Sequence, residues 1–401
     1  MTETPAFPST RPGRCPFDPA TGYAELRETD GLAKVSTPAG VDAFLISRYD
    51  DVRAVLADRR MSSQSAPSGH MEPQLDRQRE VESGSILQND GAQHTRLRRL
   101  LTSEFTVKRV QALRPRIVEL IEDHLDAMLA SDGPVDLIEA FALPIPSLVI
   151  CELLGVPYAE RDEFQRRSAI LVAVDVDQET ADQAFEELGE YVAGLVLAKQ
   201  AKREDDLLSR LITRSEEQDE PLTVEELVSI AVVLLIAGHE TTANMIGLST
   251  LALLRDPDQL DALRNNPELA PSAVEEMLRY LSVIQFGLFR QVQEDIPLGD
   301  ETIKAGEYLI AALAVGNRDE RMFPDPDRID LSRKASKHLA FGFGPHQCLG
   351  QQLARVELQE VFSRLYRRIP TLRLAVPFEE IKFKNNTIVY GVTALPVTWD
   401  R

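Results

Sequence analysis

A glycine-rich segment with a single cysteine, residues 341–350 (FGFGPHQCLG), constrains this chain more than any other part of its sequence. The run that follows, residues 351–358, carries few helix breakers and predicts a helix that begins at about Gly350. The thiol of Cys348 is then beside a helix N-terminus, where unpaired N–H groups and the helix dipole favour a thiolate. Glycines on both sides of the cysteine allow a sharp turn and the close approach of a flat ligand.

One soft anionic ligand, in a loop that can donate hydrogen bonds to its sulfur, suits a haem-thiolate iron. The alternative is a structural cysteine, because a free cysteine is usually a small buried apolar residue. The pattern formed by Phe341, Gly344, Cys348 and Gly350 resembles the Phe-x-x-Gly-x-x-x-Cys-x-Gly motif of the cytochromes P-450, the haem-thiolate monooxygenases. This resemblance implies that the cofactor is haem b, that Cys348 is its axial iron ligand, and that the other three residues shape the cofactor-binding loop.

The composition excludes several other classes of protein. The chain has 44 basic and 64 acidic residues and a net charge of −20, which disfavours nucleic acid as a partner. Its three cysteines, Cys15, Cys151 and Cys348, are far apart, which argues against a disulfide framework and against zinc or iron–sulfur sites. The longest apolar stretch, residues 230–237, is far shorter than a membrane span of roughly 20 residues. We therefore expect a soluble cytoplasmic protein without a membrane segment, and we expect a monomer.

Periodicity predicts a protein that is mainly α with a minor β region, and the resemblance implies the cytochrome P-450 fold as one domain over residues 1–401. Residues 61–89 form a polar stretch without clear periodicity, for which a mobile lid over the substrate and simple disorder are both open. Helical patterns cover residues 49–58, 94–101, 107–130, 145–154, 162–201 and 272–280, strand-like runs cover residues 43–47, 308–314 and 387–392, and residues 295–304 resemble a hairpin.

A long helix is predicted from Thr223, which forms a capping box with Glu226, to Leu254. At 1.5 Å per residue this helix is on the order of 45–50 Å long, enough to cross the domain. Its apolar middle is followed by Gly238, Glu240 and Thr241, and the carboxylate and hydroxyl of the last two are costly to bury unless they are satisfied.

Two interpretations of this polar cluster are open. In one, the hydroxyl of Thr241 bonds to the carbonyl four residues earlier and Glu240 forms an ion pair. In the other, Glu240 and Thr241 are the catalytic acid–alcohol pair that the resemblance implies, with Gly238 leaving room for O₂, Thr241 donating a hydrogen bond to the oxygen being activated and Glu240 relaying protons through water. Asn244, one turn beyond Glu240, could support this network or be an ordinary polar residue of a helix face.

The pair Glu276 and Arg279 is similar to the family's Glu-x-x-Arg, which an arginine in the segment 326–328 completes, here Arg328. The spacing alone carries no weight, because Glu163 and Arg166 repeat it. The resemblance implies a structural role for these three residues beneath the cysteine loop. For the two haem carboxylates it implies cationic or polar donors at His94, Arg98, Arg290 and His346, although Arg98 could also belong to the solvated face of a basic run.

The resemblance implies a monooxygenase that inserts one atom of O₂ into a bulky lipophilic molecule such as a macrolide or a steroid, with electrons from NAD(P)H through ferredoxin reductase and ferredoxin. The basic run 96–99, with Arg109 and Arg355, could form the patch that attracts an acidic ferredoxin. A peroxide-driven haem enzyme and a non-catalytic haem-based ligand carrier or sensor are the alternatives. Substrate contacts implied by the resemblance are Val233, Ala237, Phe286 and Ile388.

Overall fold

The computed structural model describes residue 7 and residues 15–19, 26–27, 31–37, 41–64, 85–157 and 161–400. Its larger helices are α2 (Tyr49–Ala57), α4 (Gly91–Thr102), α5 (Val107–Leu129), α6 (Pro144–Leu154), α7 (Arg161–Val172), α8 (Gln178–Ala201), α9 (Leu207–Glu216), α10 (Val224–Leu254), α11 (Pro257–Asn265), α12 (Ala270–Leu281) and α14 (Gln351–Arg368). Short helical turns are η1 (Ile138–Ala142), η3 (Pro267–Leu269), α13 (Leu313–Gly316), η4 (Gly344–His346) and η5 (Phe378–Glu380).

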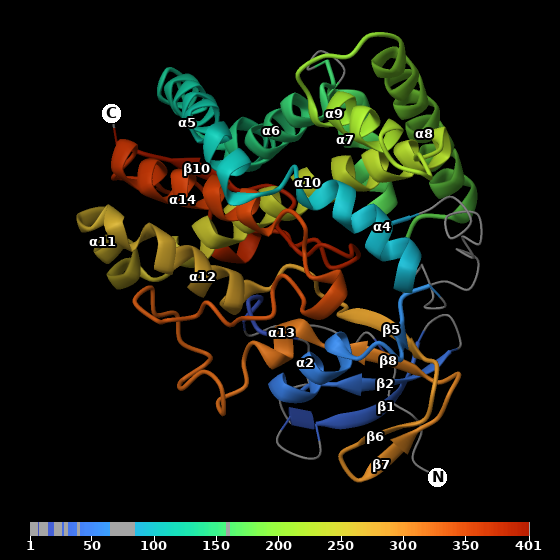
Figure 1. The fold of residues 1–401 in the computed structure, drawn as a ribbon. Coiled ribbons are helices and arrows are strands. Elements are labelled where there is room, and N and C mark those ends of the chain that lie inside the picture. The colour runs from blue at the N-terminus through green and yellow to red at the C-terminus, as the bar shows by residue number, and fades with distance from the viewer. Residues whose placement is uncertain are drawn as a thin grey trace.

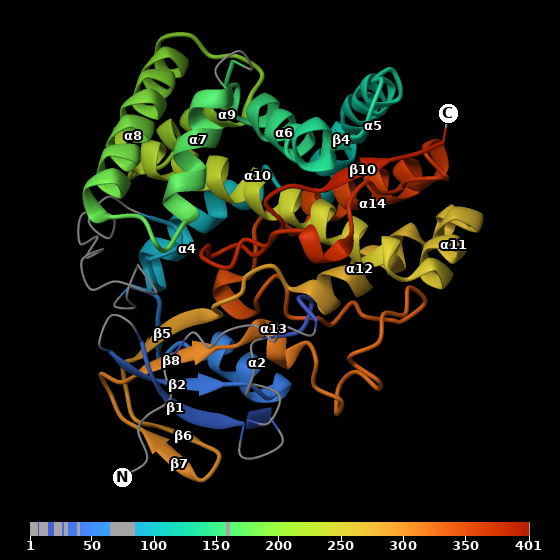
Figure 2. The same cartoon turned by 180° about the vertical axis from the view of Figure 1, so that it is seen from behind.

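The strands form small sheets. A five-stranded sheet has the order β1 (Leu32–Ser36), β2 (Asp42–Ile46), β8 (Tyr308–Ala311), β5 (Leu288–Val292), β3 (Met61–Ser62). A second sheet joins β4 (Val135–Asp136), β10 (Pro396–Thr398) and β9 (Arg373–Leu374), and β6 (Ile296–Leu298) pairs with β7 (Glu301–Ile303). Both views place the five-stranded sheet at one end of the molecule and most helices at the other (Figures 1 and 2). The predicted mainly α fold with a minor β region is confirmed.

Helix α10 runs through the helical part, between α6 and α8 on one side and α12 and α14 on the other (Figures 1 and 2). It begins with the predicted capping box, in which Thr223 and Glu226 each bond the other's main-chain N–H, and it ends at Leu254 as expected. Among the described residues, α10 is also the one helix long and apolar enough to cross a membrane. More than half of that stretch is buried in the protein, as in the core helix of a globular fold.

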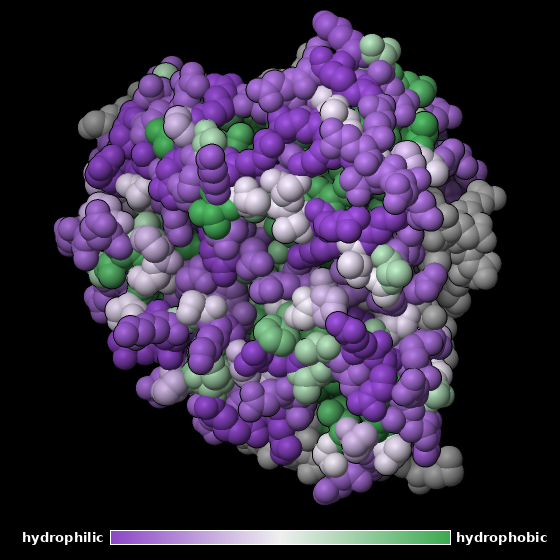
Figure 3. Space-filling view, in the orientation of Figure 1, coloured by the Kyte–Doolittle hydropathy of each residue, from purple (hydrophilic) through white to green (hydrophobic). Residues whose placement is uncertain are grey.

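The surface agrees with the acidic composition of the chain. The face drawn in Figure 3 is mostly hydrophilic, and its apolar side chains form small separate patches. Most apolar residues are in the interior. The largest cluster of buried side chains surrounds α10 and includes side chains from α5, α6, α12 and α14.

Two predicted elements are wrong. Residues 162–201 form two helices, because Asp177 caps α8 by accepting from the N–H of Thr180 at 2.9 Å, and Ala173 pairs with Thr387 instead of continuing α7. Residues 387–392 contribute isolated bridges to three different segments and no strand. The run 308–314 is a strand only as far as Ala311, after which α13 begins.

Helix α14 buries a carboxyl group, that of Glu357, whose Oε2 atom has no hydrogen-bond partner within the described part of the chain. Burial raises the pKa of Glu357 from 4.5 to about 8. The folded protein therefore holds this proton through a range in which the unfolded chain has lost it. Between these two pKa values, this residue makes the folded state less stable as the pH rises.

We expect Glu357→Gln to remove that part of the pH dependence. From about pH 5.5 to about pH 7.5, the wild type should lose about 2–3 kcal/mol of unfolding free energy more than the variant does. Urea unfolding at both pH values measures the difference. Glu360 is the matched control, because its carboxylate is paired with Arg114 and Arg364, so Glu360→Gln should shift the stability without changing its slope with pH in this range. Parallel pH profiles for wild type and Glu357→Gln would contradict the prediction.

Candidate active site

The cysteine loop closes on itself and on the N-terminal part of the chain. The N–H of Cys348 donates to the carbonyl of Phe341 at 2.8 Å. Gly344 has φ +75°, and a β-carbon there would overlap the carbonyl oxygen of Leu56, so both its backbone conformation and its contact with α2 require glycine. Gly350 precedes α14 at φ −81°, a conformation open to other residues.

Opposing influences act on the Cys348 thiol. Burial raises its pKa, whereas the N–H groups of Gly350 and Gln351 and the positive charges of Arg98 and Arg355 lower it. The N–H groups come from the first turn of α14, as the sequence predicted. A sulfur ligand at this position therefore has donors and cations at hand for its anionic form.

A pair of histidines is close to this loop. The rings of His94, on α4, and His346, in the loop, have their centroids 4.1 Å apart. His346 Nε2 is 3.0 Å from Asp90 Oδ1. Burial alone would raise the pKa of Asp90, but hydrogen bonds from His346 and Ser62 lower it to about 2. Burial and the nearby positive charges of His346 and Arg98 lower the pKa of His94 to about 4, so its imidazole is neutral at pH 7.

Two arginines converge on the same region from α4 and β5. Arg98 donates to the main-chain carbonyl of Gln347, which fixes α4 against the cysteine loop. Arg290 is buried and donates to the carbonyl of Phe289 at 2.6 Å. Neither guanidinium is within 4 Å of a carboxylate among the described residues. The four residues that the sequence singled out as donors therefore lie in the same region as Cys348. Among them, Arg98 and Arg290 form no ion pair with a described carboxylate, whereas His346 is paired with Asp90.

The polar cluster in α10 has a buried half and an accessible half. Glu240 is buried, and its Oε2 accepts from Asn244 Nδ2 at 3.2 Å. Thr241 Oγ1 donates to the carbonyl of Ala237 at 2.8 Å, the back-bond that one interpretation of the sequence expected. Ala237 and Thr241 nevertheless keep accessible surface, together with Val233, one turn apart along the same face of the helix. Their accessible surface and the back-bond are compatible, because a threonine hydroxyl can turn from its carbonyl to another partner.

Gly238 has a packing role that the sequence analysis did not anticipate. A β-carbon there would be 2.8 Å from Cδ1 of Ile150, so this glycine allows α6 to pack closely against α10. Room for O₂ beside the helix at Gly238 stays a prediction. Ala237 and Thr241 also keep accessible surface on α10.

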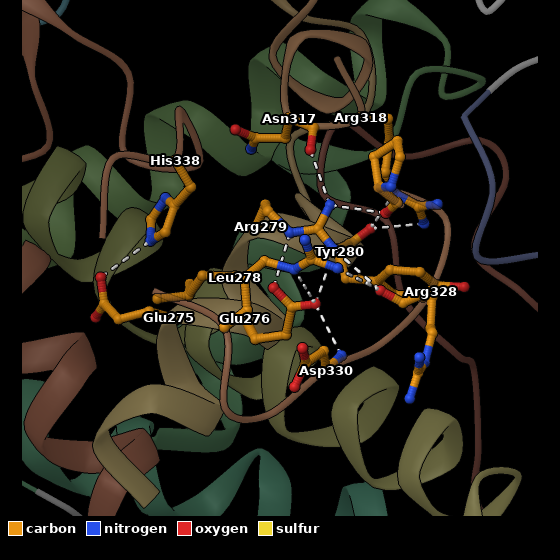
Figure 4. Close-up of polar contacts among 12 residues, drawn as sticks. Glu275, Glu276, Leu278, Arg279, Tyr280, Asn317, Arg318, Arg328, Asp330 and His338 are labelled. Carbon is orange, nitrogen blue, oxygen red and sulfur yellow. Dashed lines mark hydrogen bonds and ion pairs between the residues drawn. The ribbon is translucent and has the colours of Figure 1, made fainter. Parts of the chain in front are cut away.

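The pair Glu276 and Arg279 is fully buried and makes a bidentate contact, with both N···O distances 2.8 Å (Figure 4). Arg279 also donates to the carbonyls of Asn317 and Pro326, at 2.9 and 2.8 Å. The arginine that completes the network is Arg333, whose Nε is 3.1 Å from Glu276 Oε1.

The prediction that Arg328 completes this network is therefore wrong. It contributes its main-chain carbonyl to Arg279 at 3.4 Å, while its side chain is exposed and points away from the pair in Figure 4. The structural reason is that the chain turns at residues 330–333, where the N–H of Asp330 also donates to Glu276. Because of this turn, Arg333 is the arginine that faces the buried carboxylate.

A second ion pair beneath the cysteine loop was not anticipated. Glu275 accepts from Arg355 through both carboxylate oxygens, at 2.7 and 3.1 Å, and it is 3.3 Å from His338 Nε2. The guanidinium of Arg355 lies over the ring of Phe341, with 4.5 Å between its central carbon and the ring centroid. The ring of His338 also contacts Phe341. In the sequence, the only pointer to this ion pair was that Glu275 is adjacent to Glu276.

Comparison with known proteins identifies the family. A family model described as cytochrome P-450 matches residues 173–389, more than half of the chain. Pentalenic acid synthase of Streptomyces avermitilis is 46% identical over 400 residues, covering 98% of this chain and 97% of that protein. The chain is a cytochrome P-450. The vitamin D3 dihydroxylase of Streptomyces griseolus is 43% identical and covers 99% of this chain and 98% of that protein. The crystal structure of CYP105P1 in complex with filipin I superposes with a TM-score of 0.93 at 43% identity, and covers 99% of each chain.

This membership places the chain among the CYP105 hydroxylases of actinomycetes, and it confirms the monooxygenase class and the haem-thiolate cofactor that the sequence implied. The residues present fit that cofactor. The guanidinium groups of Arg98 and Arg290 lack carboxylate partners, and the buried Nε2 of His94 has no hydrogen-bond partner among the described residues. Two haem carboxylates are the kind of ligand that such a set of donors accepts.

The four residues expected to contact substrate in this cytochrome P-450 divide into two pairs. Val233 and Ala237 belong to the accessible face of α10. Phe286 is 5% exposed and packs edge-to-face on Phe7, and Ile388 packs against the same apolar cluster. The structure thus gives Phe286 the role of a core residue. Most of the expected lid, residues 65–84, is outside the described residues.

Proposed function

We propose that this cytochrome P-450 inserts one oxygen atom from O₂ into a bulky lipophilic small molecule, using electrons from NAD(P)H through ferredoxin reductase and ferredoxin. The observation that carries the proposal is the juxtaposition of Cys348, with donors for its anionic form, and of three donors that have no carboxylate partner among the described residues, Arg98, Arg290 and His94. Haem bound through Cys348 supplies the redox chemistry that activates O₂. Arg98, Arg290, His94 and His346 bind and orient the carboxylates of the cofactor.

Glu240 and Thr241 provide the protons that oxygen activation consumes. The hydroxyl of Thr241 is at the accessible face of α10 and turns from the carbonyl of Ala237 to donate toward the reacting oxygen. Glu240, one residue earlier, takes up protons and passes them to Thr241 through water. The buried surroundings of Glu240 limit the entry of other water and so favour product over release of reduced oxygen.

The substrate is a lipophilic compound with few charges. Val233 and Ala237, the accessible residues on α10 beside Thr241, are apolar. The relatives act on or bind compounds of this kind, since their names and titles include vitamin D3 and filipin I. Apolar walls with a few polar groups are typical of small-molecule sites.

Most of the basic residues proposed for the ferredoxin surface are paired with carboxylates. Arg96 is paired with Glu226, Arg109 with Glu104 and Arg355 with Glu275. Arg99 is exposed, forms no ion pair with a described residue, and belongs to α4, the helix that Arg98 joins to the cysteine loop. Arg99 is therefore the member of the basic run that is available to an acidic partner.

We expect Arg99→Glu to slow reduction by ferredoxin about tenfold at low salt, and less at high salt, because exposed charges mainly steer association. Stopped-flow reduction kinetics at two ionic strengths measure this rate. Arg367→Glu, the same change of charge at an exposed residue near the far end of α14, is the control. Equal rates for the two variants would remove Arg99 from the docking surface.

The proposal as a whole is tested by turnover of the haem-loaded protein with a panel of lipophilic compounds. A surrogate ferredoxin and reductase with NADPH should give hydroxylated product, with the oxygen atom derived from ¹⁸O₂. Product with hydrogen peroxide alone, and none with the electron-transfer chain, would assign the enzyme to the peroxide-driven class instead.

A further inference from the structure

Glu240 faces residues 383–392, a segment near the C-terminus that has no part in the reaction as proposed above. The Nζ atom of Lys384 is 3.9 Å from Glu240 Oε2. The segment also presses on Asn244, because a β-carbon at Gly391 would overlap the side-chain oxygen of Asn244. Asn244 in turn donates to Oε2 and to the main-chain carbonyl of Glu240. The segment therefore contacts the carboxylate of Glu240 directly through Lys384 and indirectly through Gly391.

The contacts of Glu240 differ in their access to solvent. His239 is wholly buried, and its Nδ1 is 2.6 Å from the carbonyl of Leu235, so Nδ1 carries the proton. Its Nε2, 3.7 Å from Glu240 Oε1, is then without a proton to donate, and burial lowers the pKa of this imidazole. Asn244 is buried as well. The Lys384 side chain is 28% exposed and is the contact of Glu240, among the described residues, that reaches solvent.

The carboxylate of Glu240 is also turned away from the place where its proton is needed. Successive helix residues are about 100° apart around the axis. Thr241 is on the accessible face with Ala237, whereas Glu240 is held toward residues 383–392 by Lys384 and Asn244. A proton taken up by Glu240 on the Lys384 side reaches Thr241 only after the carboxyl side chain rotates or a water molecule bridges the two.

We propose that Lys384 is a positioning residue, which holds Glu240 toward solvent between proton deliveries, and that protons enter the active site along the side of Lys384 and Gly391. Water or hydronium at the exposed side of Lys384 protonates the Glu240 carboxylate. The neutral acid loses its attraction to the lysine ammonium, turns to the Thr241 side and gives up the proton there, and the carboxylate that forms returns to Lys384. One proton enters and one leaves in each cycle, and Lys384 stays protonated throughout.

The test compares Lys384→Met with Lys384→Arg in the haem-loaded protein. Lys384→Met should lower the product formed per NADPH on the order of tenfold, with the missing electrons recovered as hydrogen peroxide, and should change the solvent isotope effect on product formation. Lys384→Arg keeps the positive charge and should restore both. Lys382→Met is the matched control, because it removes an exposed lysine two residues away on the same segment.

A spectroscopic measurement separates positioning from loss of structure. In the reduced, carbon monoxide-bound protein, Lys384→Met frees Glu240 to turn toward the ligand and should shift or split the C–O stretching band, whereas Lys382→Met should leave it unchanged. An unchanged band, together with coupling equal to that of Lys382→Met, would overturn the inference.

The inference rests on the proposed role of Glu240, and Glu240→Gln distinguishes failure of the Lys384 proposal from failure of that role. If Glu240→Gln lowers coupling and Lys384→Met does not, only the Lys384 proposal fails, whereas normal coupling in Glu240→Gln refutes the role of Glu240 itself.

Discussion

Cys348→His is expected to abolish hydroxylation, with a fall in product formation of at least about 10³-fold, equivalent to about 4 kcal/mol in the activation free energy. The thiolate is the electron-rich ligand on which this class of haem chemistry depends, and a neutral imidazole does not replace it. The carbon monoxide difference spectrum of the reduced protein reports the ligand directly. The strongly red-shifted Soret band of the wild type should be replaced in the variant by a band typical of histidine-ligated haem.

His346→Ala serves as the control for this substitution, because it changes a donor in the same loop without touching the sulfur. It should weaken retention of haem and keep the red-shifted band in the fraction that is loaded. A wild-type spectrum like that of a histidine-ligated haem would contradict the assignment of Cys348 as the ligand.

Glu276→Ala is expected to lower the unfolding free energy by about 3–5 kcal/mol, because it leaves the charge of Arg279 buried without a partner. Both side chains of this pair are 0% exposed. The chain provides a matched control in Glu163 and Arg166, which have the same spacing but side chains that are 64% and 57% exposed. Glu163→Ala should cost no more than about 0.5 kcal/mol. Denaturant unfolding of both variants measures the contrast, and similar losses in the two would contradict it.

Arg333→Ala and Arg328→Ala extend the same comparison. The side chain of Arg333 contacts Glu276, whereas that of Arg328 is exposed, so only the first substitution should destabilise the protein appreciably. A larger loss from Arg328→Ala would reinstate the residue that the sequence suggested. Both measurements are independent of haem content if the unfolding of the apoprotein is followed.

Local signals in the sequence were sufficient for much of the fold. The capping box at Thr223 located the start of α10, and the hydrophobic pattern located its buried length. The break between α7 and α8 was missed although Asp177, the cap of α8, is a local signal. The other contribution to the break, the contact between Ala173 and Thr387, joins positions more than two hundred residues apart. The start of α11 carried a local signal that was not used, an aspartate cap at Asp256 followed by Pro257.

The site shows the same division between local and distant information. Cys348 was identified from a motif and its spacing, and the donors around it from the family resemblance. Arg333 was missed, because the choice between two nearby arginines is made by the turn at residues 330–333. The sequestration of Arg355 by Glu275 and the contact of Lys384 with Glu240 could not be predicted either, because each joins segments that only the tertiary structure brings together.

The contact of Gly344 with Leu56 also bears on how the holoprotein is assembled. The loop that carries Cys348 rests on α2 through this contact and on α4 through Arg98, and both helices are synthesised long before the cysteine. The ribosome therefore delivers His94 and Arg98, two of the residues proposed to bind the haem carboxylates, long before Cys348, the proposed iron ligand. Capture of haem is then a late maturation step, which needs the N-terminal region already folded, and a truncated nascent chain that ends before residue 348 should be unable to retain the cofactor.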